Sequence, residues 1–198
     1  MEWVYIVTQL VMGWIYGHIV EYAIHRWIFH TIGKKKGHPL SFHVHDHHKT
    51  CRRNALFDVA YKKIGTSEEF WGLLFLAVMH VPLAFFLPYF YCAIIFSIMS
   101  YYLTHRAAHL NPDWARKNLS HHYDHHMGPG KCMSSNFGVR SDLIDRLLNT
   151  RIKYYGTKTE KRDWARRKLR SMQLRHAIKR RRQRKEEKKL TGPENNND

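Results

Sequence analysis

The sequence predicts an all-α integral membrane protein with about three transmembrane helices and a cytosolic, histidine-rich helical cap. Two long stretches, residues 3–20 and 70–104, contain no charged residue. The 16 histidines fall mostly into four groups that lie beside the ends of these stretches. Basic residues gather elsewhere, above all in 151–190, which holds 18 Lys and Arg against 4 Asp and Glu in a chain of net charge +17.

The first predicted span is Trp3–Val20. At about 1.5 Å per residue its length is about 27 Å, close to the hydrocarbon core of about 30 Å. No basic segment precedes it and no small-residue cleavage site follows, so we interpret it as a retained span rather than a signal peptide. We expect the helix to continue past the membrane face through Glu21, His25 and His30 and to end near Gly33.

The second apolar stretch, residues 70–104, is too long for one crossing, because a single helix of this length would extend about 52 Å. Pro88, with Pro82 nearby, offers a break. We therefore predict two spans, Phe70–Leu87 and Tyr89–His109, joined by a tight turn. A buried helix pair of a soluble protein is disfavoured, since a soluble core helix rarely lacks any polar face.

The distribution of basic residues predicts the topology. The positive-inside rule places residues 33–69 and 110–198 in the cytoplasm, and the N-terminus and the turn near Pro88 outside. All four histidine groups then lie on the cytoplasmic side of the membrane. The three cysteines are far apart and form no CxxC pair, which fits a reducing compartment and argues against a disulfide framework.

Two histidine pairs lie on predicted helices. His105 and His109 are four residues apart, so both face one side of a helix and can bind one metal ion. His25 and His30 are five residues apart, about 140° around an ideal helix. We therefore expect that they do not share a face, but that they reach two metal ions, or one ion across a helix end.

Two adjacent pairs, His47/His48 and His125/His126, point about 100° apart on a helix, so each pair can supply one ligand to each of two centres. The candidate ligands are too many for one four-coordinate zinc ion and suit two metal ions with five or six ligands each. No cysteine stands in the groups, which disfavours structural zinc. The ten candidates are His25, His30, His43, His47, His48, His105, His109, His122, His125 and His126.

Other polar residues near the groups are candidates for a supporting role at the metal site. His45 is an alternative to His43 as the first ligand of its group. Three carboxylates are either acceptors for imidazole N–H groups or solvated surface groups: Glu21, Asp46 and Asp124. Five histidines are interpreted as solvated or core imidazoles: His18, His38, His80, His121 and His176.

The spacing His25-x4-His30, His43-x3-His47-His48, His105-x3-His109 and His122-x2-His125-His126, interleaved with spans, resembles the fatty acid hydroxylase and sterol desaturase superfamily. The segments Asn136-Phe137-Gly138-Val139 and Asp145–Thr150 resemble that family's closing segment, so the resemblance covers about 21–150. The chain departs from the family in having three spans where many members have four or more. It also has Ile144 where tryptophan is usual and Asn149 where glycine is usual.

The resemblance implies a non-haem di-iron centre, with O2 as co-substrate, that hydroxylates or desaturates a C–H bond of a membrane lipid such as a fatty acyl chain or sterol. Carotenoid hydroxylases have similar boxes and are the alternative for the substrate. Electrons are expected from a separate donor protein. An alternative of another class is a non-catalytic metal-binding or metal-transporting membrane protein, and a family member without turnover is a third. A transporter needs polar groups at membrane depth to form a path. Among the histidines, only His18 and His80 lie within the predicted spans, which favours the enzyme over a transporter.

Three segments are predicted: a membrane di-iron hydroxylase-like domain, 1–155; a basic cytosolic helical tail, 156–190; and a C-terminus, 191–198, that is disordered by composition. The tail is expected to bind anionic lipid headgroups at the membrane surface. Docking of an acidic redox partner is the alternative. Nucleic-acid binding is disfavoured, because the tail has few aromatic residues and the chain is tethered to a membrane.

Overall fold

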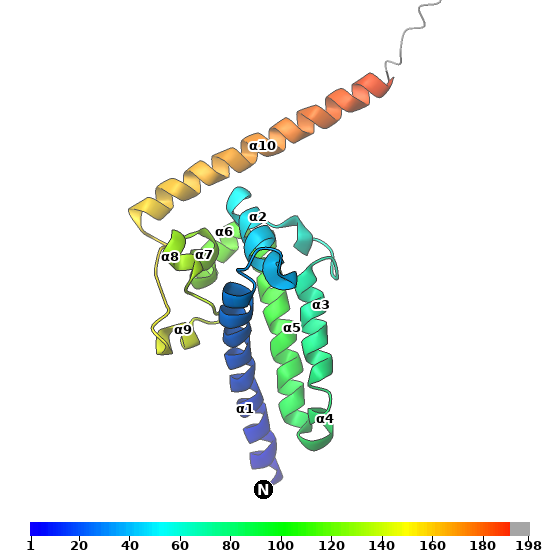
Figure 1. The fold of residues 1–198 in the computed structure, drawn as a ribbon, viewed down its shortest axis with the longest axis vertical. Helices are drawn as coiled ribbons and strands as arrows, with labels where there is room; N and C mark the ends of the chain where they lie inside the picture. Colours follow the sequence, from blue (N-terminus) through cyan, green and yellow to red (C-terminus); the bar gives the residue numbers. More distant parts are fainter. Residues whose placement is uncertain (191–198) are drawn as a thin grey trace, which may run out of the picture.

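The computed structural model describes residues 1–190, which form helices and loops without a β-strand. Three helices run side by side as a stalk, α1, α3 and α5 (Figure 1). Short helices cover the end of the stalk opposite the N-terminus and form a cap, and α10 leaves this cap obliquely (Figure 1). The disorder predicted for 191–198 lies outside the described residues.

The stalk contains α1 (Glu2–Ala23), α3 (Glu68–Met79), the short α4 (Leu83–Phe86) and α5 (Pro88–Leu110). Beyond Ala23 the first helix continues as the π-helix η1 (Ile24–Ile32). Gly33 follows as the C-cap, which confirms the predicted end of this helix.

The cap contains η2 (Pro39–Ser41), η3 (His43–His47), α2 (His48–Arg53), η4 (Val59–Tyr61), α6 (Pro112–Asn118), α7 (Ser120–Met127) and α8 (Gly130–Met133). The remaining helices are α9 (Leu143–Leu147), which contacts α1, and α10 (Lys158–Leu190). Buried apolar residues of α2, α5, α6, α7 and α8, together with Tyr154, form the core of the cap.

One described helix, Glu2–Ile32, is long and apolar enough to cross a membrane. The predicted span Phe70–Leu87 is not one helix, which corrects that part of the prediction. α3 ends at Met79, because the residues before Pro82 are disfavoured in helical conformation and form a turn. Its 12 residues rise about 18 Å, less than the hydrocarbon core. The predicted span Tyr89–His109 lies within α5.

The close approach of α1 to α5 depends on glycine. A Cβ atom on Gly13 would lie 2.6 Å from the carbonyl oxygen of Phe90 and 2.8 Å from Cβ of Ala93. Gly17, one turn further along α1, faces Ser97 in the same way. Small residues at this spacing let two helix backbones meet closely in apolar surroundings. The side-chain oxygen of Gln9 also accepts a hydrogen bond from the N–H of Phe90, at the start of α5.

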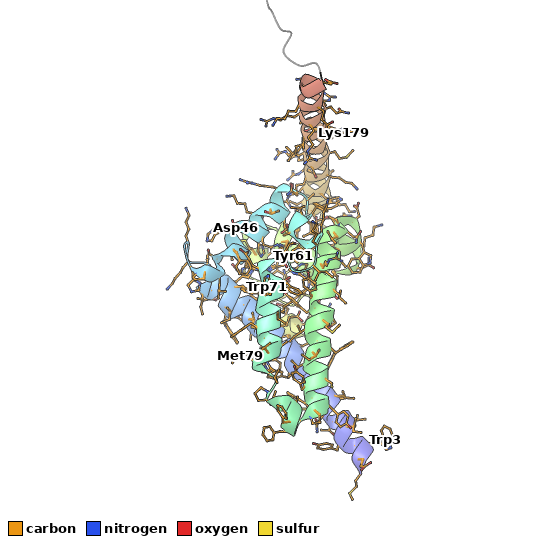
Figure 2. The ribbon with its side chains drawn as sticks, turned by 90° about the vertical axis from the view of Figure 1, so that its right-hand side faces the viewer. Trp3, Asp46, Tyr61, Trp71, Met79 and Lys179 are labelled. Atoms are coloured by element: carbon orange, nitrogen blue, oxygen red, sulfur yellow. The ribbon has the colours of Figure 1, made fainter. Side chains whose placement is uncertain are left out.

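The first turns of α10 are fixed to the cap. The buried Glu160 carboxylate accepts hydrogen bonds from Arg116 Nε at 2.6 Å and from the Tyr123 hydroxyl at 2.9 Å. Trp164 packs edge-on against Tyr123, and Arg167 donates to the carbonyl of Met127. Further along, α10 extends away from the cap, and Lys179 lies far from Trp3 at the opposite end of the molecule (Figure 2).

Replacing Gly13 by valine is expected to destabilise the protein, because the new side chain meets a backbone oxygen that cannot move aside. The expected loss is about 1–3 kcal/mol in the free energy of unfolding, measured by thermal denaturation in detergent. Gly72→Ala is the matched control, because a Cβ at Gly72 of α3 meets nothing within 4 Å. Equal stability of Gly13→Val and wild type would contradict the glycine-dependent contact.

Candidate metal centre

The ten predicted ligands come together in two adjoining clusters. In the first cluster, one ligand atom from each residue lies within 4.8 Å of the others: His25, His30, His43, His48 and His125. In the second cluster, His105, His109, His122 and His126 meet the same criterion, and His47 meets it with His109 and His126. The clusters touch where the His48 and His126 rings stack, with their centroids 4.2 Å apart.

Two π-helices place ligands that ideal α-helices would separate. His25 and His30 belong to the same cluster with ring centroids 5.0 Å apart, which corrects the prediction that they cannot share a face. The reason is that Ile24–Ile32 is a π-helix, in which residues five apart lie above one another. The same spacing relates His43 to His48 at the end of η3, where the His48 N–H bonds the His43 carbonyl.

The adjacent histidines divide between the clusters. His48 and His125 belong to the first cluster, and their neighbours His47 and His126 contact the second. Consecutive side chains on a helix point about 100° apart. One helical segment of the cap therefore contributes to both clusters, and α7 does the same.

The distances between imidazole nitrogens fit shared metal ions. In the first cluster the Nε2 atoms of His25 and His43 are 3.0 Å apart, and those of His125 and His48 are 3.2 Å apart. In the second, His105 and His109 are separated by 3.0 Å. Ligand nitrogens bound to one metal ion at about 2.1 Å lie about 3.0–3.4 Å apart, depending on the coordination geometry.

The tautomers of His105 and His109 show why a cation fits. The Nδ1 of His109 lies 2.9 Å from the Leu56 carbonyl, and the Nδ1 of His105 lies 2.8 Å from the Glu69 carboxylate. Both oxygens only accept, so each neutral ring carries its proton on Nδ1. Their Nε2 atoms are then two lone pairs facing each other at 3.0 Å. A metal ion between the two nitrogens would accept both lone pairs.

Buried imidazole nitrogens without a hydrogen-bond partner also indicate a metal site. Both ring nitrogens of the fully buried His126, and Nε2 of His47, have no hydrogen-bond partner within the described part of the chain. An unsatisfied buried polar group costs about 1–3 kcal/mol. Metal coordination at one nitrogen of each ring would offset part of this cost, so these residues fit a metal ion.

The groups that orient the ligands include two carboxylates that the sequence reasoning missed. Asp58 binds Nδ1 of His47 at 2.9 Å, and Glu69 binds Nδ1 of His105. Hydrogen bonds of this kind fix the ring and direct the other nitrogen to the metal. Glu69 had a detectable signal, because it is an acidic residue directly before the charge-free stretch. Asp58 had none, since it lies in a loop 11 residues from His47.

The closing segment also orients the ligands, through backbone carbonyls. The carbonyl of Phe137 accepts from His25 Nδ1 at 2.5 Å, and that of Ser135 accepts from His125 Nδ1 at 2.7 Å. The Asp145 carboxylate in turn accepts from the N–H groups of Phe137 and Gly138. The residues of this segment that match the family pattern therefore orient histidines of the first cluster through hydrogen bonds.

Two residues of this segment, Ile144 and Asn149, differ from the family pattern, and both are compatible with its conformation. Asn149 has φ of +54°, in the left-handed region where glycine is favoured and asparagine is the best tolerated alternative. Ile144 is half-buried on α9. Neither side chain belongs to the two histidine clusters.

The predicted carboxylate acceptors contact other groups. Glu21 accepts from the N–H groups of Val139 and Arg140 and pairs with the Arg140 side chain. Asp124 is buried and bonds Arg151 and the N–H of Tyr155, and burial raises its pKa despite this arginine. These contacts fit neither of the two alternatives predicted for these residues, since neither carboxylate bonds an imidazole and both bond arginine and backbone N–H groups.

Asp46 and His45 lie at the periphery. Asp46 is exposed. His45 is outside both clusters and its Nε2 contacts the carbonyl of Lys34 at 3.1 Å, so the structure places His43 and not His45 at the centre. Of the histidines set apart from the clusters, His121 contacts the Val139 carbonyl and His80 contacts the Tyr16 hydroxyl.

A cysteine does lie beside the second cluster, contrary to the sequence-based argument. The Sγ of Cys51 is 3.4 Å from Nδ1 of His109, and this residue can join His47, His109 and His126 around an ion. However, burial raises the pKa of the Cys51 thiol well above its usual value, which disfavours the thiolate form that binds metals. Imidazole is the better supported ligand type.

An apolar cavity of about 340 Å³ lies among α1, α3 and α5. It reaches His25 and Glu69 at the metal centre, while Tyr16 and His80 line it further down the stalk. Between them most of the lining residues are aliphatic or aromatic, for example Ile24 and Leu73, and the polar ones are Glu21, Ser97 and Arg140. This cavity, called the apolar cavity below, has the character of a site for a hydrocarbon chain.

The fold and the site define a helical protein in which an apolar stalk carries two buried histidine clusters able to hold metal ions. The model of the fatty acid hydroxylase family matches residues 10–150, and the chain belongs to this family. Members of the family are generally hydroxylase-like oxidoreductases and are typically membrane-associated. Searches against curated proteins and against solved structures give no significant match.

The alternative between His43 and His45 can be decided with matched variants. His43→Ala is expected to lose about one metal ion per chain, because it removes a ligand from the first cluster. His45→Ala is expected to retain the full metal content. Elemental analysis of the two purified variants, with circular dichroism as a check on folding, measures both. Metal loss in His45→Ala but not in His43→Ala would contradict the assignment.

The buried imidazoles predict acid sensitivity of the metal-free protein. Burial, followed by repulsion from neighbouring imidazoles, lowers the pKa of five cap histidines well below 6.5: His43, His48, His122, His125 and His126. Between these lowered values and 6.5 the unfolded chain binds more protons than the folded chain, so stability falls as the pH falls below 6.5. Thermal denaturation should show a Tm at pH 5.5 lower by about 5 °C or more than at pH 7.5. A constant Tm would contradict burial of neutral rings.

Proposed function

We propose that this protein is an O2-dependent non-haem di-iron oxidoreductase that hydroxylates or desaturates a C–H bond of a membrane lipid, such as a fatty acyl chain or sterol. The observation that carries the proposal is the meeting of two histidine clusters with one end of the apolar cavity, at His25 and Glu69. Family membership supports lipid oxidation as the class of reaction.

The ligands would hold one iron ion in each cluster, which accounts for ten histidines better than a single ion does. When bound, the two ions supply the redox chemistry that activates O2. The protein contributes the orientation of the rings, through Asp58, Glu69 and the carbonyls of Ser135 and Phe137. Each ligand of the second cluster is buried, so bulk water is kept from the reacting groups.

The apolar cavity is proposed to bind the hydrocarbon chain. A lipid chain lying along α1 would place one of its carbons beside His25, since this residue lines the cavity and belongs to the first cluster. The glycine at position 72 widens this region, because no atom lies within 4 Å of where its Cβ would be. Orientation of the chain by the cavity walls decides which C–H bond meets the metal centre.

The stalk is proposed to lie in the membrane, with three spans formed by α1, the α3–α4 region and α5. Large apolar side chains on its outer surface support this, for example Trp3 at 78% exposure, Phe75 at 66% and Phe96 at 64%. Exposed apolar surface of this extent is rare on soluble monomers. The basic residues of the cap and tail then place the clusters and the C-terminus in the cytoplasm by the positive-inside rule.

Electrons are proposed to come from a separate donor protein. The cationic α10 is proposed to bind anionic lipid headgroups, each basic residue near the surface contributing about 1 kcal/mol. Docking of an acidic donor remains the alternative for this helix. Nucleic acid is disfavoured as a partner, for the reasons of composition given above.

Two other functions differ in observable ways. A carotenoid hydroxylase would use the same centre on a longer, rigid polyene, so the product distinguishes it. A non-catalytic metal-binding or metal-transporting protein would hold metal without oxidising lipid. The apolar cavity favours the enzyme, because most of its wall is apolar and its Glu21 carboxylate is already paired with Arg140 rather than free for a cation.

The test is expression in a lipid-producing host, followed by mass spectrometry of total lipid. Wild type is expected to yield a hydroxylated or desaturated lipid. His125→Ala is expected to yield none, because it removes a first-cluster ligand that is fully buried. His45→Ala is the matched control and should retain the product. Two metal ions per chain without any new lipid in a host that also supplies an electron donor would favour the non-catalytic alternative.

A further inference from the structure

A second cavity, of about 280 Å³, opens beside the metal centre and has a different chemical character. Its lining residues come from the cap and the first turn of α3: Phe42, His43, Asp46, His47, Thr50, Asp58, Ala60, Tyr61, Thr66, Ser67, Glu68 and Glu69. Figure 2 shows Asp46 and Tyr61, two of its lining residues, at the level of the cap. We call it the polar cavity.

The polar cavity is acidic in a strongly basic protein. Four carboxylates line it, Asp46, Asp58, Glu68 and Glu69, and none of its lining residues is lysine or arginine. The chain as a whole carries a net charge of +17. Asp46 and Glu68 are exposed, whereas Asp58 and Glu69 are buried against histidine ligands. Negative charge therefore continues from solvent to the metal centre.

The inner wall of the cavity carries an unpartnered ligand. His47 lines it, is 8% exposed, and has an Nε2 atom without a hydrogen-bond partner in the described residues. Its Nδ1 is held by Asp58 at 2.9 Å. His43 of the first cluster lines the same cavity. Each of the two clusters therefore contributes a ligand to the wall.

We propose that the polar cavity is the site through which divalent metal ions reach the two clusters. This inference rests on the proposed metal centre. Asp46 and Glu68 bind the incoming hydrated cation at the mouth, and His47 and His43 receive it as it loses water. The apolar cavity is the less suitable route, because most of its wall cannot compensate an ion for lost hydration and its Glu21 carboxylate is paired with Arg140. Acidic groups in a cleft concentrate cations and raise association rates about 10-fold or more.

The experiment measures the rate at which the metal-free full-length protein, in non-ionic detergent, takes up Co2+, followed by visible absorption. Asp46→Asn/Glu68→Gln is expected to slow uptake about tenfold at low salt, with the same final amount bound. The rate for wild type should fall with added salt, because salt screens the attraction by the exposed carboxylates. The rate for the double variant should not fall, because its remaining exposed charge is mainly positive and repels the cation.

Asp113→Asn/Glu2→Gln is the control, because it removes two exposed carboxylates outside the polar cavity. This variant should take up Co2+ at the rate of wild type. Equal rates for wild type and Asp46→Asn/Glu68→Gln, or equal slowing by the control, would overturn the inference. Failure of wild type to bind Co2+ at all would instead overturn the metal centre itself, so the two failures are distinguishable.

Discussion

The structure depends on gathering imidazole lone pairs in a space that excludes water. His105 and His109 face each other through Nε2 atoms at 3.0 Å, and each ring already donates its proton elsewhere. Such an arrangement directs both lone pairs to a position that one metal ion could occupy. The surrounding cap, with its buried core and its carboxylate and carbonyl acceptors, supplies the free energy that holds these rings together.

Several segments serve this one constraint. The π-helices turn residues five apart onto a common face, the closing segment presents carbonyls to His25 and His125, and Asp145 fixes that segment from behind. Gly13 and Gly17 bring α1 against α5, so that ligands from the inner ends of both helices reach one centre. The motifs typical of the family therefore act together to position the histidine rings and do not form independent sites.

The centre is approached by two cavities of opposite character that share Glu69. The apolar cavity in the stalk suits a hydrocarbon chain, whereas the polar cavity in the cap suits hydrated ions. Under the two proposals, a lipid and a cation would approach the same metal centre through different cavities. Glu69 lies at the boundary because it is in the first turn of α3, directly after the polar loop.

The sequence by itself determined the helical class, the ten candidate ligands and the family, because these depend on composition, on local spacing and on a motif. It also predicted the continuation of the first helix to Gly33. Only the tertiary structure decided that His25 and His30 share a cluster, that His43 and not His45 faces inward, and that Asp58 and Glu69 rather than Glu21 and Asp124 orient the rings. The physical reason is that ring direction depends on the local helix type, and the partner of a buried N–H depends on contacts between segments far apart in the chain.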